Sequence, residues 1–501
     1  MAIRTIELSP ITRIEGHLEF KVEVEGGAVQ EAYASGALFR GFELMLKGRH
    51  PMDALAFTPR ICGVCPTSHS IAATKALDDA LQAEVPPNAH LMRSILLGVE
   101  NTMSHATAFY ALFGPDLVNP RYADHPAYGE LNRRLAPLSG SSYLAAVKAR
   151  VKLDEIFALL GGQHPHGNCF VPGGITFKPD LAHITKALVI LMEAQEFVEE
   201  TILGGKVARW LEVKSLADVE KWLGEGGHAQ SDLGLFLQLG PQLGLDRLGR
   251  GPGRFVAYGV YDQADGHPWL KPGFFDGELH TLDPNRITEH VKHSWYQDYE
   301  GGRHPGQGET YPRLDRANPQ KYSFAKAPRY QDQVAEVGPL ARMINDQDPL
   351  VLDLAQKLGP NVYTRVLARL HEAVRTLAQV GEWLHQIDLS QPFYHKPRHP
   401  HPKEAMGVGM TEAARGALGH WVQIRKGVIE AYQVVTPTAW NVSPRDFRDQ
   451  PGAIEQAVTG TPVPDEANPV EVQHVIRSFD PCIACTVHLV RGTQALQALE
   501  L

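Results

Sequence analysis

Two short cysteine motifs, one near each end of the chain, constrain this fold more than any other feature of the sequence. Cys62 and Cys65 form one C-x-x-C, and Cys482 and Cys485 form the other. A C-x-x-C places two thiolates close enough to hold one ion, so the two pairs together can supply four sulfurs to a single site. If they do so, the two ends of the chain must meet inside the fold.

The spacing of the cysteines leaves several kinds of site open. A structural zinc site suits the residue types, but such motifs usually close a small module within a few tens of residues. A redox disulfide would need only one C-x-x-C. Thiolates also select copper(I), iron clusters and nickel. A site that joins both ends of a long chain is better suited to a buried catalytic centre than to a structural clip.

The composition excludes several classes of protein. The chain has 501 residues, of which 43% are hydrophobic and 21% charged, and this mix rules out a disordered protein. A net charge of −9 argues against a nucleic-acid partner. No apolar run is long enough to span a bilayer, and the N-terminus lacks the apolar region of a signal peptide. We therefore expect a cytoplasmic chain, unless a partner carries it to the membrane or the periplasm.

Apolar residues at helical spacing predict several long helices. Many of them are apolar around much of their circumference, which is typical of a buried bundle. The ranges are 71–81, 90–110, 143–160, 181–203 and 362–387. Strands are expected at 18–24 and 28–33, and loops and short strands at 224–345. Because no linker is evident, we predict one helix-dominated α+β unit.

The residues around both cysteine pairs closely resemble the two metal-binding motifs of nickel–iron hydrogenase large subunits. The resemblance continues in the family's order along nearly the whole chain, at residues 13–17, 40–43, 161–166, 171–174, 412–416 and 432–441. It implies the family's fold, a buried bundle of long helices with peripheral β-strands. It also implies a single domain over residues 1–488.

The resemblance implies a nickel–iron centre that cleaves dihydrogen reversibly into protons and electrons. Cys62 and Cys482 would be terminal nickel ligands, whereas Cys65 and Cys485 would bridge nickel to an iron that carries carbon monoxide and cyanide. Maturation enzymes and nickel-insertion proteins would have to build this centre. Only Cys169 is left over, so the electrons must leave through an iron–sulfur small subunit, an obligate partner.

Three further residues take catalytic roles by the same resemblance. Glu15 matches the glutamate that carries protons from the centre. Arg415 matches the arginine that lies over the open nickel–iron position, and Asp480 would pair with it because a buried guanidinium needs a partner. Judged without the resemblance, Glu15 is better explained as a surface carboxylate or an ion pair with Arg13.

A second metal site is implied near the C-terminus. Glu43, His488 and a backbone carbonyl at about Val434 match the ligands of a magnesium (or iron(II)) ion. The alternative for Glu43 is a salt bridge with Arg40.

Two histidines are expected close to the nickel–iron centre. His69 and His166 would donate hydrogen bonds around it, or they are ordinary satisfied core histidines. Cys169 is expected to be a small buried residue without a role at the centre.

Two positions depart from the family pattern. Many members have proline where this chain has Ala414, and aspartate where it has Ser104. Both changes alter the polarity over the open site, so oxygen tolerance and catalytic bias cannot be transferred, and assignment to the membrane-bound respiratory branch is weakened. We predict a catalytic subunit that works in the uptake direction, with a low-turnover hydrogen sensor as the alternative. A third alternative is a structural relative like the homologous subunit of respiratory complex I. That subunit has lost the cysteine ligands, and their presence in this chain argues against this alternative.

The resemblance also implies that a maturation protease removes residues 489–501. A tail after His488 would have to leave the core and find partners for its backbone polar groups on the way out. We therefore expect the mature chain to end at His488.

Overall fold

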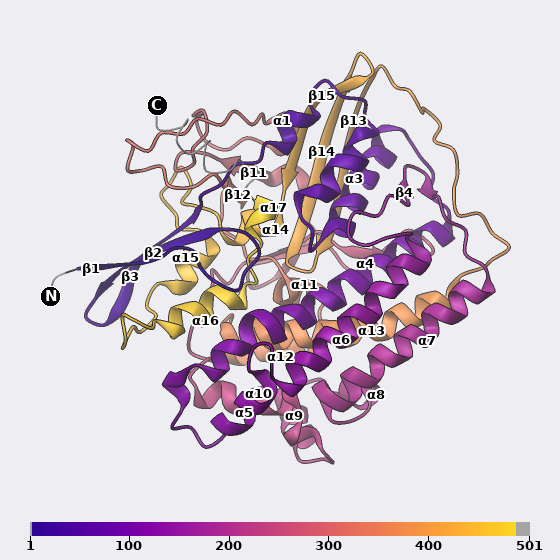
Figure 1. Cartoon of the computed structure of the whole chain (residues 1–501). Helices are drawn as coiled ribbons and strands as arrows, with labels where there is room; N and C mark the ends of the chain where they lie inside the picture. The colour runs from indigo at the N-terminus through magenta and orange to yellow at the C-terminus, as the bar shows by residue number, and fades with distance from the viewer. Residues whose placement is uncertain (1–2, 487–501) are drawn as a thin grey trace.

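The computed structural model describes residues 3–486, and of Cys485 and Thr486 it describes only the backbone. Long helices form the lower part of the molecule as seen in Figure 1, and a three-stranded sheet stands above them. The last described residues lie between these two parts. A single large core cluster takes residues from Ile11 to Ile483, so both ends of the chain contribute to the same interior.

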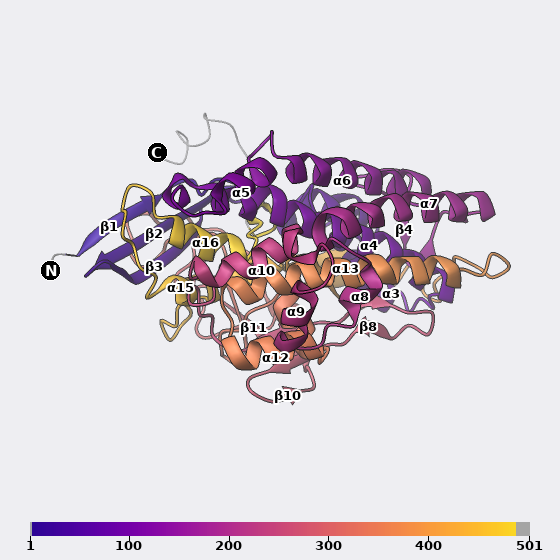
Figure 2. The same cartoon turned by 90° about the horizontal axis from the view of Figure 1, so that it is seen from below.

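Four long helices form the centre of the bundle. They are α4 (Pro87–Thr107), α6 (Ser141–Leu160), α7 (Leu181–Phe197) and α13 (Val362–Gln386). Helix α13 packs against α4 and α7, and α6 packs against the same two helices (Figure 2). With α3 (Pro66–Ala80), they confirm the five helices expected from the apolar spacing.

Two of the expected helices end in a π-helical turn instead of an α-helical one, and the predicted end of the second, residue 203, is confirmed. Both α4 and α7 continue into a π-helical turn, at Ala108–Phe113 and Val198–Leu203. The wider turn keeps the apolar side chains facing the core, which is why the helical spacing extends to these residues. Gly204 then closes the second turn with a left-handed conformation, as is common at helix ends.

The remaining helices are shorter and lie around the bundle. They are α1 (Phe42–Leu46), α2 (Asp53–Phe57), α5 (Tyr128–Leu135), α8 (Val207–Leu211), α9 (Leu216–Leu223), α10 (Asp232–Gln242), α11 (Pro339–Asn345), α12 (Pro349–Leu358), α14 (Pro437–Asn441), α15 (Ala453–Val458), α16 (Val470–Ser478) and α17 (Ile483–Thr486).

The N-terminal strands form an antiparallel sheet in the order β1 (Arg4–Leu8), β2 (Leu18–Glu25) and β3 (Ala28–Gly36). Buried and partly exposed residues alternate along β2, as the sequence predicts. Gly26 and Gly27 both have positive φ and make the turn. The sheet extends away from the body of the molecule (Figure 1).

A second antiparallel sheet has no counterpart in the sequence-based prediction. It consists of β13 (Glu404–Ala413), β14 (Gly416–Arg425) and β15 (Val428–Val435), and it packs against α3. A Cβ atom on Gly409 would lie 1.9 Å from the carbonyl oxygen of Ala72, so glycine lets the strand approach the helix. Because β14 is buried on both faces, its sequence lacks the usual alternation.

Residues 224–345 are mostly loops and short strands, as predicted, but α10 and α11 also lie there. The prediction was wrong for these two helices because their glycine and proline content hides the helical spacing: Pro241 lies inside α10, and Pro339 begins α11. The short strands of the chain are β4 (Phe170–Val171), β5 (Gly174–Ile175), β6 (Phe255–Ala257), β7 (Val260–Asp262), β8 (Pro268–Leu270), β9 (Gly273–Phe275), β10 (Leu279–His280), β11 (Ile287–His290) and β12 (Ala327–Tyr330).

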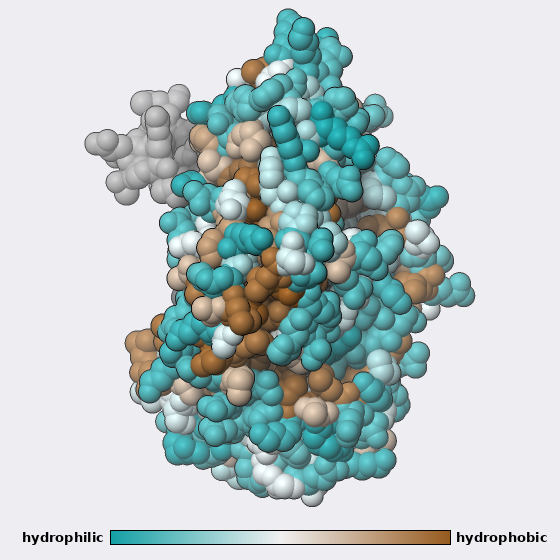
Figure 3. Space-filling model, turned by 90° about the vertical axis from the view of Figure 1, so that its right-hand side faces the viewer, coloured by the Kyte–Doolittle hydropathy of each residue, from teal (hydrophilic) through white to brown (hydrophobic). Residues whose placement is uncertain are grey.

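Polar side chains cover most of the face shown in Figure 3, and apolar ones gather in a band across its middle. Within residues 3–486, no helix has both the length and the apolar character needed to cross a bilayer. The helix-dominated α+β class predicted from the sequence is confirmed.

Candidate metal centre

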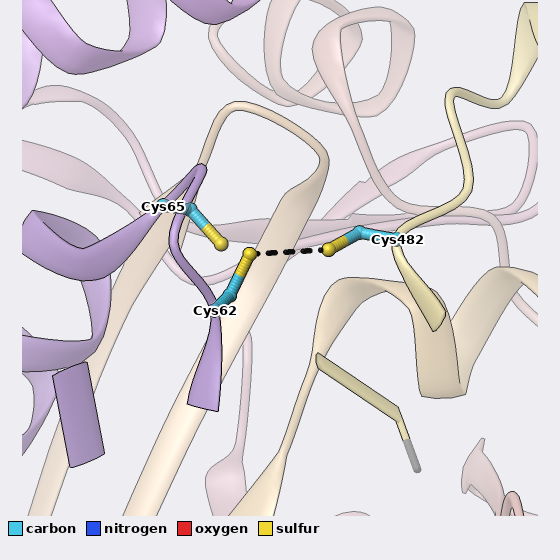
Figure 4. A group of neighbouring side chains, drawn as sticks. All are labelled: Cys62, Cys65 and Cys482. Atoms are coloured by element: carbon cyan, nitrogen blue, oxygen red, sulfur yellow. Dashed lines mark hydrogen bonds between the residues drawn. The ribbon is translucent and has the colours of Figure 1, made fainter. Parts of the chain in front are cut away.

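Three cysteine sulfurs meet in the interior, and we call this group the thiolate cluster. Cys62, Cys65 and Cys482 are buried, and their Sγ atoms all lie within 4.8 Å of one another. Figure 4 shows Cys62 and Cys65 on one loop and Cys482 on another, with the sulfurs pointing toward each other. The Sγ atoms of Cys62 and Cys482 are 3.3 Å apart. The side chain of Cys485, the fourth expected ligand, lies outside the described residues.

Local backbone structure places these sulfurs. Cys62 is the extended residue after a short 3₁₀ turn, Thr58–Ile61, and Cys65 is the N-terminal cap of α3. Cys482 precedes α17, and its N–H donates to the Thr438 hydroxyl at 3.0 Å. A C-x-x-C at the start of a helix keeps both side chains on the same side of the loop.

The N-terminal motif holds the C-terminal motif in place. Glu15 forms a parallel β-bridge with Cys482, and the N–H of Ile483 donates to the Glu15 carbonyl at 2.7 Å. Next to this bridge, Gly16 has a φ of 84°, and a Cβ there would lie 2.7 Å from the Ala484 nitrogen. Only glycine tolerates both conditions. This close contact brings residues far apart in the sequence to the edge of the thiolate cluster.

Arg40 links the two cysteine loops. Its guanidinium donates to the carbonyl oxygens of Ile61 and Arg60, next to Cys62, and to the Ala484 carbonyl at 3.2 Å. One planar group with five donors can satisfy several carbonyls at once, which a lysine cannot do. Arg40 therefore acts as a cross-link between the chain ends.

Glu15 is half-buried beside the cluster. Burial and the negative charge of Cys62 raise the pKa of its carboxyl, and the charges of Arg415 and Arg40 oppose this rise. The alternative ion pair with Arg13 is not what the structure shows, because Arg13 pairs with Asp116 and donates to the Leu112 carbonyl at 2.8 Å.

Arg415 lies at the tip of the β13–β14 hairpin. Ala413 pairs with Gly416, so Ala414 and Arg415 form the two-residue turn. The guanidinium donates to the Asp480 carboxylate at 3.1 Å and to its backbone carbonyl at 3.0 Å, and it lies 3.4 Å from the Ser104 hydroxyl. Burial lowers the pKa of Arg415, but Asp480 and the cysteines raise it well above the usual value. The pairing of Arg415 with Asp480 is therefore observed.

Two arginines that support this group were missed from the sequence. Arg369 on α13 lies 3.3 Å from the other oxygen of Asp480, so that carboxylate is shared by two guanidinium groups. Arg342 on α11 donates to the carbonyl oxygens of Ala413 and Ala414, at 2.8 and 3.0 Å, and thereby fixes the hairpin tip. For Arg369 the available signal was a charged residue among the apolar positions of α13.

The two predicted histidines have different hydrogen-bond partners. His69 is fully buried on α3, and its Nδ1 is 3.2 Å from Nε2 of His420, whose Nδ1 is 2.9 Å from the Tyr432 hydroxyl. Burial lowers the pKa of His69 to about 4, so the ring is neutral at neutral pH. His166 is half-buried, with Nδ1 3.1 Å from the Pro59 carbonyl. Sequence reasoning assigned no role to His420, which lies outside the matched motifs, or to Tyr432, which begins the matched stretch 432–441.

One predicted magnesium ligand, Glu43, lies in a second polar group, which we call the oxygen cluster. It consists of Glu43, Glu289, Thr310, Lys326 and Gln433, all buried. Glu43 accepts from the N–H of Val434 at 2.9 Å and from the Thr310 hydroxyl. Lys326 donates to Gln433 at 2.6 Å and to Glu289 at 3.1 Å, and it lies 3.8 Å from Glu43.

The donor set of the oxygen cluster suits a hard cation such as magnesium. His488, the third expected ligand, lies outside the described residues. The alternative salt bridge of Glu43 with Arg40 is not found among residues 3–486, where Arg40 donates to backbone carbonyls.

A cavity leads from the surface toward the thiolate cluster. Its volume is about 260 Å³, and apolar residues predominate in its lining. Its lining includes Val64, which lies between the cysteines of the first motif, and Ser104, which contacts Arg415. Tyr143, Val147 and Val151 of α6 are among its other lining residues.

Comparison with known proteins agrees with this geometry. The family model described as nickel-dependent hydrogenase matches residues 40–125, 116–209 and 244–488. The periplasmic [NiFeSe] hydrogenase large subunit of Desulfomicrobium baculatum is 35% identical, over 97% of this chain and 95% of its own length. The hydrogenase-2 large chain of Escherichia coli is 31% identical, over 97% of both chains.

A solved structure has the same fold. The reduced, active form of the Ni-Fe-Se hydrogenase from Desulfomicrobium baculatum matches 97% of this chain and 100% of its own, with a TM-score of 0.83 and 35% identity. Sequence, fold and the thiolate cluster thus lead to one conclusion. The chain belongs to the nickel-dependent hydrogenase family and is the large subunit of a nickel–iron hydrogenase, an oxidoreductase that acts on dihydrogen.

Proposed function

We propose that this chain cleaves dihydrogen at a nickel–iron centre held by Cys62, Cys65, Cys482 and Cys485. The observation that carries the proposal is the buried thiolate cluster, because three converging soft ligands suit nickel and iron. Cys62 and Cys482 would bind nickel alone, and Cys65 and Cys485 would bind both metals. When bound, the centre with its carbon monoxide and cyanide ligands activates dihydrogen and receives its electrons. The chain offers cysteine at all four positions, so its ligands are sulfur alone.

In this proposal Glu15 takes the proton away from the thiolate cluster. Its backbone is bonded to the Cys482 segment, and its carboxyl is half-buried at the edge of the cluster. The raised pKa brings the carboxyl closer to neutral pH, where it can both accept and release a proton.

Arg415 and Asp480 would shape the space beside the sulfurs. Two hydrogen bonds to Asp480 fix the guanidinium of Arg415, so its charge stays directed at the cluster. A fixed cation beside thiolates stabilises negative charge without reorganising during the reaction. Ser104, which here takes the position of an aspartate in many relatives, adds a hydroxyl and no further charge.

The cavity beside α6 would admit the substrate. Dihydrogen is small and apolar, and residues such as Met103, Ala106 and Val147 give the cavity a mainly apolar wall. Because Val64 and Ser104 are among its lining residues, the cavity lies close to the thiolate cluster. Larger side chains at Ala106 should slow the entry of dihydrogen and of carbon monoxide alike, which gas-diffusion kinetics would detect.

The electrons would leave through an iron–sulfur small subunit. The fifth cysteine, Cys169, is buried, and burial raises the pKa of its thiol to about 12, so it is a poor ligand for a cluster. We infer an obligate heterodimer, in which the large subunit alone lacks a path for electrons.

The oxygen cluster would hold magnesium or iron(II), with Glu43, the Val434 carbonyl and His488 as ligands. We further propose that residues 1–488 form one domain. The mature chain would end at His488, after a maturation protease has removed residues 489–501. Intact-mass measurement on nickel-loaded protein tests this proposal, and a full-length mass in the active fraction would contradict it.

We propose catalysis in the uptake direction. The uptake hydrogenase large subunit of Cupriavidus necator is 30% identical over 97% of this chain. The alternative is a hydrogen sensor of low turnover, which would keep the same ligands. We expect the chain in the cytoplasm, and the periplasmic relative indicates that a partner could carry such a chain across the membrane.

The proposal is tested on the purified heterodimer. Nickel and iron at one each per large subunit, with infrared bands from carbon monoxide and cyanide, are the expected result, and zinc alone would contradict it. Rapid hydrogen-dependent reduction of an artificial acceptor then supports an enzyme, whereas full metal content with very low turnover supports the sensor.

A further inference from the structure

Helix α3, which begins directly after Cys65, has its N-terminus capped by a residue from another helix. Glu100, in the middle of α4, accepts from the N–H of Thr67 at 2.7 Å and from the N–H of Ser68 at 2.9 Å. The hydroxyl of Ser68 donates to the same carboxylate at 2.6 Å. Cys65 is the N-cap residue, but its side chain does not accept from the first N–H groups of the helix. The carboxylate is therefore the anion at the start of this helix.

A histidine supplies the opposite charge. Nε2 of His164 lies 3.8 Å from Glu100, and its Nδ1 lies 2.9 Å from the Asp154 carboxylate. The ring stacks on Phe157 with 4.4 Å between centroids. Burial lowers the pKa of His164, but the two carboxylates more than offset this and raise it to about 9. His164 is therefore a cation at neutral pH.

The position of Glu100 has an electrostatic consequence for Cys65. The free N–H groups at a helix N-terminus carry partial positive charge, which stabilises a neighbouring thiolate and withdraws electron density from it. Here two of those N–H groups are bonded to a full negative charge. Glu100 is buried and lines the same cavity as Val64, the residue just before Cys65.

We propose that Glu100 is a positioning residue of the metal centre, which fixes the start of α3 and, with His164 as counter-ion, sets the electron density at the Cys65 sulfur. The proposal rests on the proposed function, because it assumes that Cys65 is a ligand. The proposal predicts that removing either charge changes the electron density at the centre while nickel and iron stay bound. Removing the negative charge of Glu100 and removing the positive charge of His164 must change that electron density in opposite directions.

The experiment compares Glu100→Gln and His164→Gln in the purified heterodimer. The readouts are nickel and iron content, the frequency of the carbon monoxide band and the reduction potential of the centre. Loss of the negative charge in Glu100→Gln should move the band to higher frequency and the potential to more positive values. Loss of the positive charge in His164→Gln should move both in the other direction, and the double variant should lie between them.

Glu455→Gln is the matched control. Glu455 is also a buried carboxylate that accepts backbone N–H groups, from Ala34 and Gly452, but it lies at α15 and β3. This variant should leave band and potential unchanged. Shifts of the same sign in both test variants, or no shift with full metal content, would overturn the proposal. If Glu100→Gln does not load metal, the shift in His164→Gln alone decides. Absence of nickel and iron from the unaltered protein would instead contradict the proposed function.

Discussion

The thiolate cluster and the oxygen cluster both connect the C-terminal part of the chain to its N-terminal part, but their charges are balanced differently. At the oxygen cluster, Lys326 already lies between Glu43 and Glu289. At the thiolate cluster, Arg415 and Arg369 share the single carboxylate of Asp480, so together they leave one net positive charge beside several thiolates. Buried like charges repel strongly unless a cation joins them.

This difference predicts how strongly each cluster depends on metal. The thiolates need a metal both for charge balance and for chemistry, whereas the oxygen cluster retains an internal cation when its metal is lost. Substitutions at the thiolate cluster should therefore abolish function, and substitutions at the oxygen cluster should weaken it. The following experiments are ordered by the expected size of their effect.

The largest effect is expected for the cysteines. Each of Cys62→Ser, Cys65→Ser, Cys482→Ser and Cys485→Ser should abolish hydrogen oxidation, because a hydroxyl is a poor ligand for a soft centre. Nickel content and activity of the purified variants are the measurements. Cys169→Ser, at a buried cysteine outside the cluster, should have nearly the nickel content and activity of the unaltered protein. Full activity in any of the first four would remove that cysteine from the site.

The next largest effect concerns the proton route. Glu15→Gln keeps the shape of the side chain but cannot carry a proton, so turnover should fall by about 10²–10⁴ while metal content is unchanged. Because the pKa of Glu15 is raised, the pH–rate profile of the unaltered enzyme should show a limb above the usual glutamate value, and the variant should lose it. Glu19→Gln, at a partly exposed position beside His17, is the control. Loss of metal in Glu15→Gln would indicate a structural role instead.

A smaller effect is expected for Arg415→Lys. A lysine cannot reproduce the paired bonds to Asp480, so activity should fall at least about tenfold, a barrier increase of roughly 1.4 kcal/mol, with the metals retained. Arg425→Lys, at the other end of β14, where the side chain is exposed and paired with Glu430, should have normal kinetics. Unaltered steady-state kinetics in Arg415→Lys would exclude Arg415 from the mechanism.

The smallest effect on activity is expected at the oxygen cluster. Glu43→Gln should lower magnesium content and cost about 1–3 kcal/mol of stability, because the bonds from Val434 and Thr310 lose a charged acceptor. Activity should fall less than in Arg415→Lys. Metal analysis and thermal unfolding measure both effects, with the exposed Glu309→Gln as control. An unchanged magnesium content would argue that Glu43 is not a ligand.

The sequence was informative where function depends on short motifs, and much less so where it depends on packing. The cysteine pairs, Glu15, Arg415 and Glu43 all lie in motifs with fixed spacing, and the structure brings the described ones into two clusters. Arg369 and Glu100 support the thiolate cluster from long helices and Arg342 supports it from the short helix α11, and in none of these helices does the charged residue have characteristic neighbours. The β13–β15 sheet was missed for a related reason, since its middle strand is buried on both faces and shows no alternation.

The central claim is that the thiolate cluster holds nickel, and anomalous X-ray scattering tests it most directly. Crystals of the purified active heterodimer would be measured at energies on both sides of the nickel absorption edge. The account predicts one nickel peak among the sulfurs of Cys62, Cys65 and Cys482. A peak at the zinc edge alone, or a nickel peak elsewhere in the chain, would contradict it.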